Sequence, residues 1–356
     1  MIFVFIIIIF AGYGLEFLGK LLKNNTLQKL MYMIVLIVSI LNLFYVFYLY
    51  HPLVAYSDFS QTPQIALKLQ ELGAVRIYVH KANMRTFNEF NNTIQNKVPR
   101  YLSLQNDLVP NSNIIWKIPS SAFYSSFGPK RLYYFMSLFE DSYSPSSSAS
   151  SQISFAGLRM LSIRNTDTIV SPIKLHNDAL KFAAQFKLTD LENQYTYIYR
   201  NDDVLPEVYA YSNLSDISTF KDFVKLMSNQ SFDIKKQALI ENRDFDFQSE
   251  HELEFEASSI SKSSAYYRFN IKLNQQALIT LARTYYPGWF VKVDGKVTKI
   301  YPVNLVNMGT IVSEGNHIVE FVFNPLSFRI GMLITVSGYL IIAFLFLIKR
   351  RIINEL

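Results

Sequence analysis

Three long apolar runs constrain what this chain can fold into more than any other feature. Residues Leu30–Tyr50 and Ser327–Ile348 are each long enough to cross a bilayer as a helix, and Met1–Leu18 is a shorter apolar run that carries Glu16. The hydrocarbon core of a bilayer is about 30 Å thick and needs about 20 apolar residues in a helix. The sequence therefore predicts a multi-pass cell-membrane protein with three transmembrane helices and one large folded region, residues 51–326.

The distribution of basic residues predicts which side of the membrane this region faces. Basic residues close to the runs gather in the loop between the first two and in the tail after the third: Lys20, Lys23, Lys29, Lys349, Arg350 and Arg351. Positively charged flanks stay in the cytoplasm. Arg329 is the exception, and its long side chain can extend from the edge of the span to the headgroups. We therefore expect residues 51–326 to be extracytoplasmic and the tail 349–356 to be cytoplasmic.

The N-terminus has no basic segment ahead of Ile2–Phe10 and no small-residue cleavage site, so a cleaved signal peptide is not expected. Two interpretations stay open. Either the first run is a plain reverse anchor, or the chain is the C-terminal piece of a larger multi-span protein.

Charge and composition exclude several classes of function. The net charge is +6, but the membrane and cytoplasmic segments hold seven basic and two acidic residues, which is +5 and leaves +1 for residues 51–326. A nearly neutral domain has no field to hold a polyanion, so no nucleic-acid partner is expected. The chain has no Cys, and its five His residues form no HxH or HExxH pair. We therefore expect no metal site, and no motif indicates a cofactor.

Residues 51–205 are expected to form an extracytoplasmic α/β domain. Hydrophobic spacing predicts helices over Gln64–Leu72, Lys130–Phe139 and Phe155–Ile163. Alternation predicts strands at Val75–Val79 and Gln194–Arg200, and Thr168–Pro172 is predicted to be an edge strand. Residues 142–151 contain seven Ser and one Pro, which is typical of a flexible loop.

Residues 206–326 are expected to form an extracytoplasmic β-sandwich that leads directly into the span 327–348. Seven short strands are predicted between Glu252 and Phe323, beginning with the alternating segment Glu252–Glu256. Asp294-Gly295 is a strong signal for a two-residue hairpin turn, and Glu314-Gly315-Asn316 marks a second tight turn. The fold class is thus a membrane protein of α+β type.

Segments near the C-terminus form a recognisable series. They are Tyr285–Trp289 (YYPGW), Val293–Lys296 (VDGK), Glu314–Phe321 (EGNHIVEF) and Asn324-Pro325. They resemble the end of the bacterial YfhO-like membrane proteins, which are large multi-span proteins of the GT-C glycosyltransferase type. In that family a "YPGW…VDG…GxHxVxFxYxP" pattern closes the outer domain ahead of a final helix. Weaker similarities lie upstream, at Pro110–Asn113 with Tyr124, Leu158–Ile163, Tyr199–Asn201 and Leu205-Pro206, so the resemblance extends from about Asp58.

The resemblance implies an outer domain of a sugar-transfer system that uses lipid-linked donors. Family members carry many N-terminal spans, with the acidic catalytic residue in an early outer loop, and this chain departs from that pattern. No catalytic residue is therefore carried over. The expected function is to bind or position a glycan or lipid-linked sugar in cell-envelope glycosylation, with membrane lipids and a multi-span membrane protein as further partners.

Two alternatives stay open beside that function. In the first, the chain is itself a lipid-linked-sugar glycosyltransferase, for which Asp58, eight residues past the second run, is the best-placed acid. In the second, the chain is a structural assembly module of a membrane complex without a ligand.

The candidate glycan-binding residues are Tyr285, Tyr286 and Trp289, because a flat aromatic face stacks on sugar C–H groups. The competing and favoured interpretation places Trp289 in the hydrophobic core. For Asp294, a role in forming the Asp-Gly turn is favoured over a catalytic role. Glu16 lies four residues before Lys20, so an ion pair at the membrane boundary is favoured over a functional carboxylate.

Overall fold

The computed structural model describes residues 2–22, 24–50, 56–80, 108, 111–121, 128–138, 153–187, 195–245 and 251–355, and within these it leaves out the side chains of 2–5, 48–50, 58–59 and 349–355. The predicted Ser-rich loop 142–151 lies outside the described residues. The chain divides into two compact units, Met1–Gln61 with Ile94–Leu102, and Thr62–Thr93 with Ser103–Leu356.

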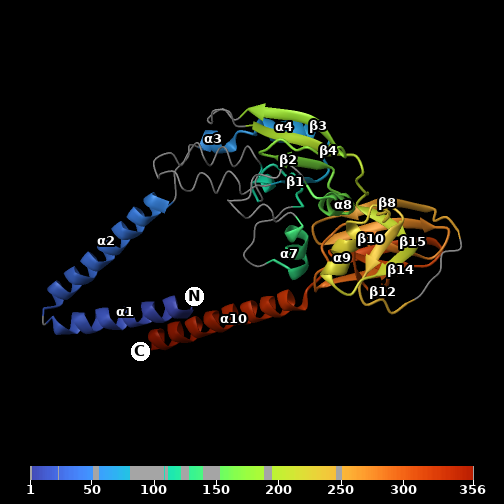
Figure 1. Ribbon diagram of the computed structural model, residues 1–356. Helices are drawn as coiled ribbons and strands as arrows, with labels where there is room; N and C mark the ends of the chain where they lie inside the picture. The colour runs from blue at the N-terminus through green and yellow to red at the C-terminus, as the bar shows by residue number, and fades with distance from the viewer. Residues whose placement is uncertain are drawn as a thin grey trace. The chain divides into compact units, whose positions relative to one another are not determined.

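The described part of the first unit is helical. It consists of α1 (Ile2–Leu21), α2 (Asn25–Tyr50) and α3 (Tyr56–Ser60) (Figure 1). Glu16 and Lys20 form the predicted i, i+4 ion pair at 2.7 Å. A side chain at Gly19 would collide with the Tyr32 hydroxyl of α2, so glycine permits the close approach of α1 and α2 there.

Two helices in the described residues are long and apolar enough to cross a membrane. They are Asn25–Phe47 in α2 and Leu326–Ile348 in α10 (Leu326–Glu355), and neither is buried against the rest of the protein. Exposed apolar helices of this length are typical of membrane spans. A third span at Met1–Leu18 remains a prediction.

The second unit combines helices with three β-sheets, so the mixed α+β class is confirmed. Its helices besides α10 are α4 (Gln64–Glu71), η2 (Ser112–Ile114), α7 (Lys130–Ser137), α8 (Phe155–Ile163) and α9 (Phe220–Met227). Two of them begin at side-chain caps that satisfy free backbone N–H groups. The Ser154 hydroxyl accepts from the N–H of Gly157 in α8, and Thr219 and Asp222 form a reciprocal capping box on α9.

The first sheet has four strands in the order β1-β2-β4-β3. They are β1 (Ile77–Val79), β2 (Thr168–Ser171), β4 (Tyr195–Asn201) and β3 (Leu180–Lys187). The prediction of an edge strand at 168–172 was wrong, because β2 pairs with β1 on one side and β4 on the other. Pro172 follows the strand instead of lying in it, so its missing N–H costs no ladder bond.

Residues 208–323 build two further sheets. The six-stranded sheet has the order β5-β10-β14-β13-β7-β6, with β5 (Val208–Tyr211), β10 (Ala277–Leu281), β14 (Asn307–Val312), β13 (Tyr301–Val303), β7 (Gln237–Ile240) and β6 (Asn213–Asp216). The five-stranded sheet has the order β12-β11-β15-β9-β8, with β12 (Lys296–Thr298), β11 (Trp289–Val293), β15 (Gly315–Phe323), β9 (Tyr266–Leu273) and β8 (Phe255–Lys262). One hydrophobic cluster contains residues of both sheets, among them Ile279 and Phe321. The sandwich architecture and the domain boundary at 205/206 remain predictions.

Two predicted turns connect these strands differently. Asp294 and Gly295 both have positive φ and close the hairpin of β11 and β12, as the sequence predicts. Glu314, by contrast, leads from β14 in one sheet to β15 in the other, so this tight connection is a crossing and not a hairpin. The strand expected at Glu252–Glu256 begins only at Phe255, because the Asn274 side chain binds the backbone of Glu252 and Glu254.

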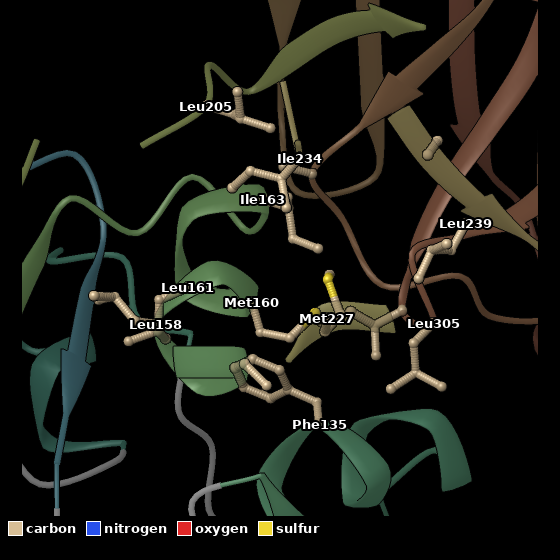
Figure 2. Close-up of a cluster of buried hydrophobic side chains, with 14 of the residues drawn as sticks. Phe135, Leu158, Met160, Leu161, Ile163, Leu205, Met227, Ile234, Leu239 and Leu305 are labelled. Carbon is tan, nitrogen blue, oxygen red and sulfur yellow. The ribbon is translucent and has the colours of Figure 1, made fainter. Parts of the chain in front are cut away.

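A second hydrophobic cluster ties α7, α8 and α9 to the first and second sheets. Figure 2 shows Leu158 and Leu161 on one side of α8 and Met160 and Ile163 on the other, with the Phe135 ring of α7 beside Met160. All five side chains are buried. Because apolar residues cover both sides of α8, this helix is an internal element of the unit.

A buried ionic network links β1 to the six-stranded sheet. Asp167 Oδ1 accepts the backbone N–H groups of Val75 (3.0 Å) and Arg76 (3.1 Å), and its Oδ2 lies 2.9 Å from Arg200 Nη1. The Arg76 guanidinium donates to the Ala282 carbonyl at 3.1 Å and lies 3.6 Å from Glu207. The buried charges are therefore compensated by partners that are far apart in the sequence.

Arg164, at the C-terminal end of α8, is buried without an acidic partner among the described residues. Its guanidinium donates to the side-chain oxygens of Asn307 (3.1 Å) and Thr284 (3.3 Å), and its Nε has no hydrogen-bond partner in the described structure. Burial lowers the pKa of Arg164 to about 9. The side chain is therefore still charged at neutral pH.

Candidate functional site

The YYPGW segment connects β10 to β11 and is fixed against the start of α10. The carbonyl of Gly288 accepts the N–H of Asn324 at 2.8 Å. Gly288 has φ +106, and a Cβ at this position would lie 2.8 Å from Pro325 Cβ. Only glycine fits both the backbone conformation and the close approach. The segment is thereby held at the junction between β15 and the apolar helix.

The three predicted glycan-binding residues contact different neighbours. The Tyr286 ring lies 6.4 Å from the ring of Phe323, and the Trp289 ring lies 5.3 Å from it. The Tyr285 ring instead lies 5.4 Å from the guanidinium of Arg131. Tyr286, Phe323 and Trp289 therefore form one group, which we call the aromatic row, and Tyr285 is not a member of it. Phe323 was missed by the sequence analysis, although the alternation of β15 contains it.

The members of the aromatic row differ in exposure. Tyr286 is 45% exposed, whereas Trp289 is half-buried and packs against the cluster shared by the two sheets. Trp289 also approaches Tyr267, whose ring centre is 6.2 Å away. Much of the Trp289 side chain is therefore covered by core packing, as the favoured interpretation predicts. Tyr286 is the member of the row that is most open to a ligand.

Asp294 and His317 come from separate parts of the motif and form a hydrogen-bonded pair. Asp294 Oδ2 lies 2.7 Å from His317 Nδ1, and Asp294 Oδ1 accepts the N–H of Ile318 at 2.8 Å. The carboxylate of the hairpin turn therefore holds the beginning of β15. The predicted turn role of Asp294 is confirmed, and its bond to His317 is an addition that sequence spacing does not reveal.

This pair makes stability depend on pH. The hydrogen bond to Asp294 raises the pKa of His317, and the hydrogen bond from His317 lowers the pKa of Asp294. The His317 contribution is complete below the unfolded pKa of about 6.5 and is lost as pH rises through the higher folded value. The Asp294 contribution is complete above the unfolded pKa of about 3.9 and is lost as pH falls through the lower folded value.

We therefore expect Asp294→Asn to cost the most stability between about pH 4 and pH 6.5. Because the Asp294 side chain is 50% exposed, the effect should be only about 0.5 kcal/mol. Urea midpoints of both proteins at pH 5 and pH 8.5 measure it. An equal difference at the two pH values would contradict the assignment.

Two further predictions concern a catalytic acid and metal ligands. Asp58 belongs to α3, but its side chain lies outside the described residues, so the structure adds nothing to its weak catalytic candidacy. In the described part of the chain, no three His, Asp or Glu side chains are grouped so that they could hold a metal ion.

The fold and the site define a class of protein with apolar helices of membrane-spanning length and a large α+β region, in which the YYPGW segment lies next to the last helix. Comparison with known protein families finds a similarity over part of the chain. Residues 224–335 match the family described as bacterial membrane protein YfhO. The match runs from α9 into α10 and contains all four segments of the C-terminal motif, so the resemblance is confirmed for this part. The weaker similarities upstream lie outside it and remain predictions.

No curated protein and no solved structure gives a significant match to the chain.

Proposed function

We propose that this chain is a membrane-anchored component of a glycosyltransferase-related system, and that its large folded region binds or positions a glycan or a lipid-linked sugar. The main support for this proposal is the position of the aromatic row. Phe323 ends β15 three residues before Leu326, where the apolar helix α10 begins. Exposed Tyr286 contacts Phe323. The row therefore lies next to the anchor, where the sugar of a membrane-embedded lipid would be presented.

The chemistry of the row suits a sugar. The faces of aromatic rings carry partial negative charge, and they attract the weakly positive C–H groups on one side of a sugar ring. Tyr286 also offers a hydroxyl that can bond to a sugar hydroxyl. The alternative is that the aromatic row only anchors the protein at the membrane interface, since Tyr and Trp are enriched at membrane boundaries without binding any ligand.

The orientation is part of the proposal. Residues 51–326 would be extracytoplasmic, because the basic residues close to the spans, apart from Arg329, lie on the opposite side of each apolar run. Protease added to intact cells should then remove this region. Digestion only after the cells are opened would contradict the orientation. The remaining proposed partners are the lipids around α2 and α10 and a multi-span membrane protein.

Replacing Tyr286 is the sharpest test of glycan binding, because this residue is exposed and Trp289 is partly in the core. We expect Tyr286→Ala to weaken binding about fivefold to tenfold, which corresponds to a loss of about 1–1.4 kcal/mol. The measurement is the affinity of the full chain, in lipid nanodiscs, for an array of cell-envelope glycans and for a polyprenyl-phosphate-linked monosaccharide.

Phe182→Ala is the matched control, since Phe182 is 56% exposed on β3 of the four-stranded sheet. Its binding should equal that of the wild-type chain. Equal losses in both variants, no loss in Tyr286→Ala, or no glycan bound by the wild-type chain would each contradict the proposed role of the aromatic row.

A further inference from the structure

The five-stranded sheet carries a hollow of about 620 Å³ that no sequence motif singles out. Its floor is formed by β8, β9 and β15. Phe269, Ile271 and Leu273 of β9 are buried, whereas Asn270 and Lys272 between them are exposed. The polar residues of the hollow therefore point away from the hydrophobic cluster, on the face of the sheet opposite to it. We call this feature the sheet hollow.

The strand register brings polar side chains into two adjacent rows across the sheet hollow. Asn270 pairs with Ser258 on one side and with Ile318 on the other. Lys272 likewise pairs with Glu256 and with Asn316. Asn270 and Asn316 are thus diagonal neighbours on β9 and β15. Diagonal side chains on one face lie about 7–8 Å apart, so one ligand can reach both amides.

Several hydrogen-bonding groups in the sheet hollow are free for a ligand. The side chains of Ser258, Asn270 and Asn316 make no hydrogen bond to another described residue. Each Asn amide offers two donors and one acceptor in a plane, and the Ser hydroxyl offers both functions. Such paired donors and acceptors match adjacent hydroxyl groups, which also donate and accept.

The acidic and basic side chains of the sheet hollow are paired with each other. Lys272 Nζ lies 3.2 Å from Glu256 Oε1, and His317 Nδ1 lies 2.7 Å from Asp294 Oδ2. Every acidic or basic lining side chain that the structure describes therefore has a partner within the hollow. The site therefore disfavours a polyanion or a cation and favours a neutral, polyhydroxylated ligand.

We infer that the sheet hollow is a second saccharide-binding site, specific for neutral sugars. The choice of a saccharide as the ligand rests on the proposed function. The position of this second site is separate from the aromatic row. Asn316 and Phe323 lie near opposite ends of β15, seven residues and about 23 Å apart. The sheet hollow thus holds sugar units farther along a glycan chain, or an acceptor glycan, while the row faces the anchor.

The test combines affinity with location of the bound sugar. The probes are neutral tetrasaccharides of N-acetylglucosamine, glucose and mannose, with an oligogalacturonate as the anionic comparison. The double variant Asn270→Ala/Asn316→Ala should lower the affinity of the full chain for a neutral probe at least tenfold. The control Asn213→Ala removes an exposed Asn from β6 of the other sheet and should bind like the wild-type chain.

Hydrogen–deuterium exchange separates this site from the aromatic row. A neutral probe should protect residues 256–258, 270–272 and 316–318, and this protection should persist in Tyr286→Ala. If that protection is absent while Tyr286-dependent binding remains, the sheet hollow is not a saccharide site and the proposed function stands. If the probe protects the hollow but binding does not depend on Tyr286, the sheet hollow is a saccharide site and the proposed role of the aromatic row is wrong. Equal affinity for the oligogalacturonate would overturn the inference of a neutral ligand.

Discussion

Replacing Asp167 by alanine should lower the free energy of unfolding by about 3–5 kcal/mol, because removal of one partner leaves buried charges uncompensated. Asp167 is almost completely buried, accepts hydrogen bonds from the N–H groups of Val75 and Arg76, and forms an ion pair with the guanidinium of Arg200. Its loss leaves the buried N–H group of Arg76 and the part-buried N–H group of Val75 without this acceptor. It also removes a negative charge close to the buried Arg76.

Urea unfolding of the full chain in detergent measures this effect, with the fluorescence of Trp116 and Trp289 as the signal. Asp167→Asn keeps an oxygen for the two N–H groups and should cost less than the alanine variant. Asp203→Ala is the surface control, since Asp203 pairs with Lys235 where both side chains are 55% exposed, and it should cost about 0.5 kcal/mol. Equal losses for Asp167→Ala and Asp203→Ala would refute the role of the buried network.

Truncation of Phe135 to alanine should cost a similar amount, about 3–5 kcal/mol, because it leaves a cavity in a closely packed cluster. The Phe135 ring is fully buried and lies beside Met160 of α8 (Figure 2). It is the buried residue of α7, so it attaches that helix to the rest of the second unit.

The same denaturation experiment tests this prediction. Phe135→Leu keeps most of the volume and should cost less than the alanine variant. Phe182→Ala removes a ring that is 56% exposed and makes an edge contact with Tyr199, so it should cost about 1 kcal/mol. A loss at position 135 no larger than that at position 182 would mean that α7 is not held by this side chain.

The elements that the sequence predicts well are those with local signals. The helix predicted at Phe155–Ile163 coincides with α8, and the strand predicted at Gln194–Arg200 lies within one residue of β4 at each end. Asp294-Gly295 forms the hairpin turn that its residue types demand. Apolar length alone located the helices at 30–50 and 327–348. In each case the information lies within one turn, strand or helix.

The features that escaped prediction depend on contacts between distant residues. The tight turn at Glu314 looks like a hairpin in sequence, but its flanking strands pair with β9 and β10 in different sheets. Phe323 joins the aromatic row only because β15 pairs with β11. The backbone partners of Asp167, at Val75 and Arg76, are 92 and 91 residues away. For α9, by contrast, the sequence contains a local signal that the prediction did not use, the Thr219…Asp222 capping box.

The chain passes between the two larger sheets several times, and three of the links are very short: Asn274–Gln276 between β9 and β10, Lys299-Ile300 between β12 and β13, and Ser313-Glu314 between β14 and β15. Links of two or three residues leave little slack for one sheet to slide over the other. The face that carries Asn270 and Asn316 is therefore preshaped before a ligand arrives. A preshaped face loses little conformational freedom on binding, so even a few hydrogen bonds to a weakly held sugar would give measurable affinity.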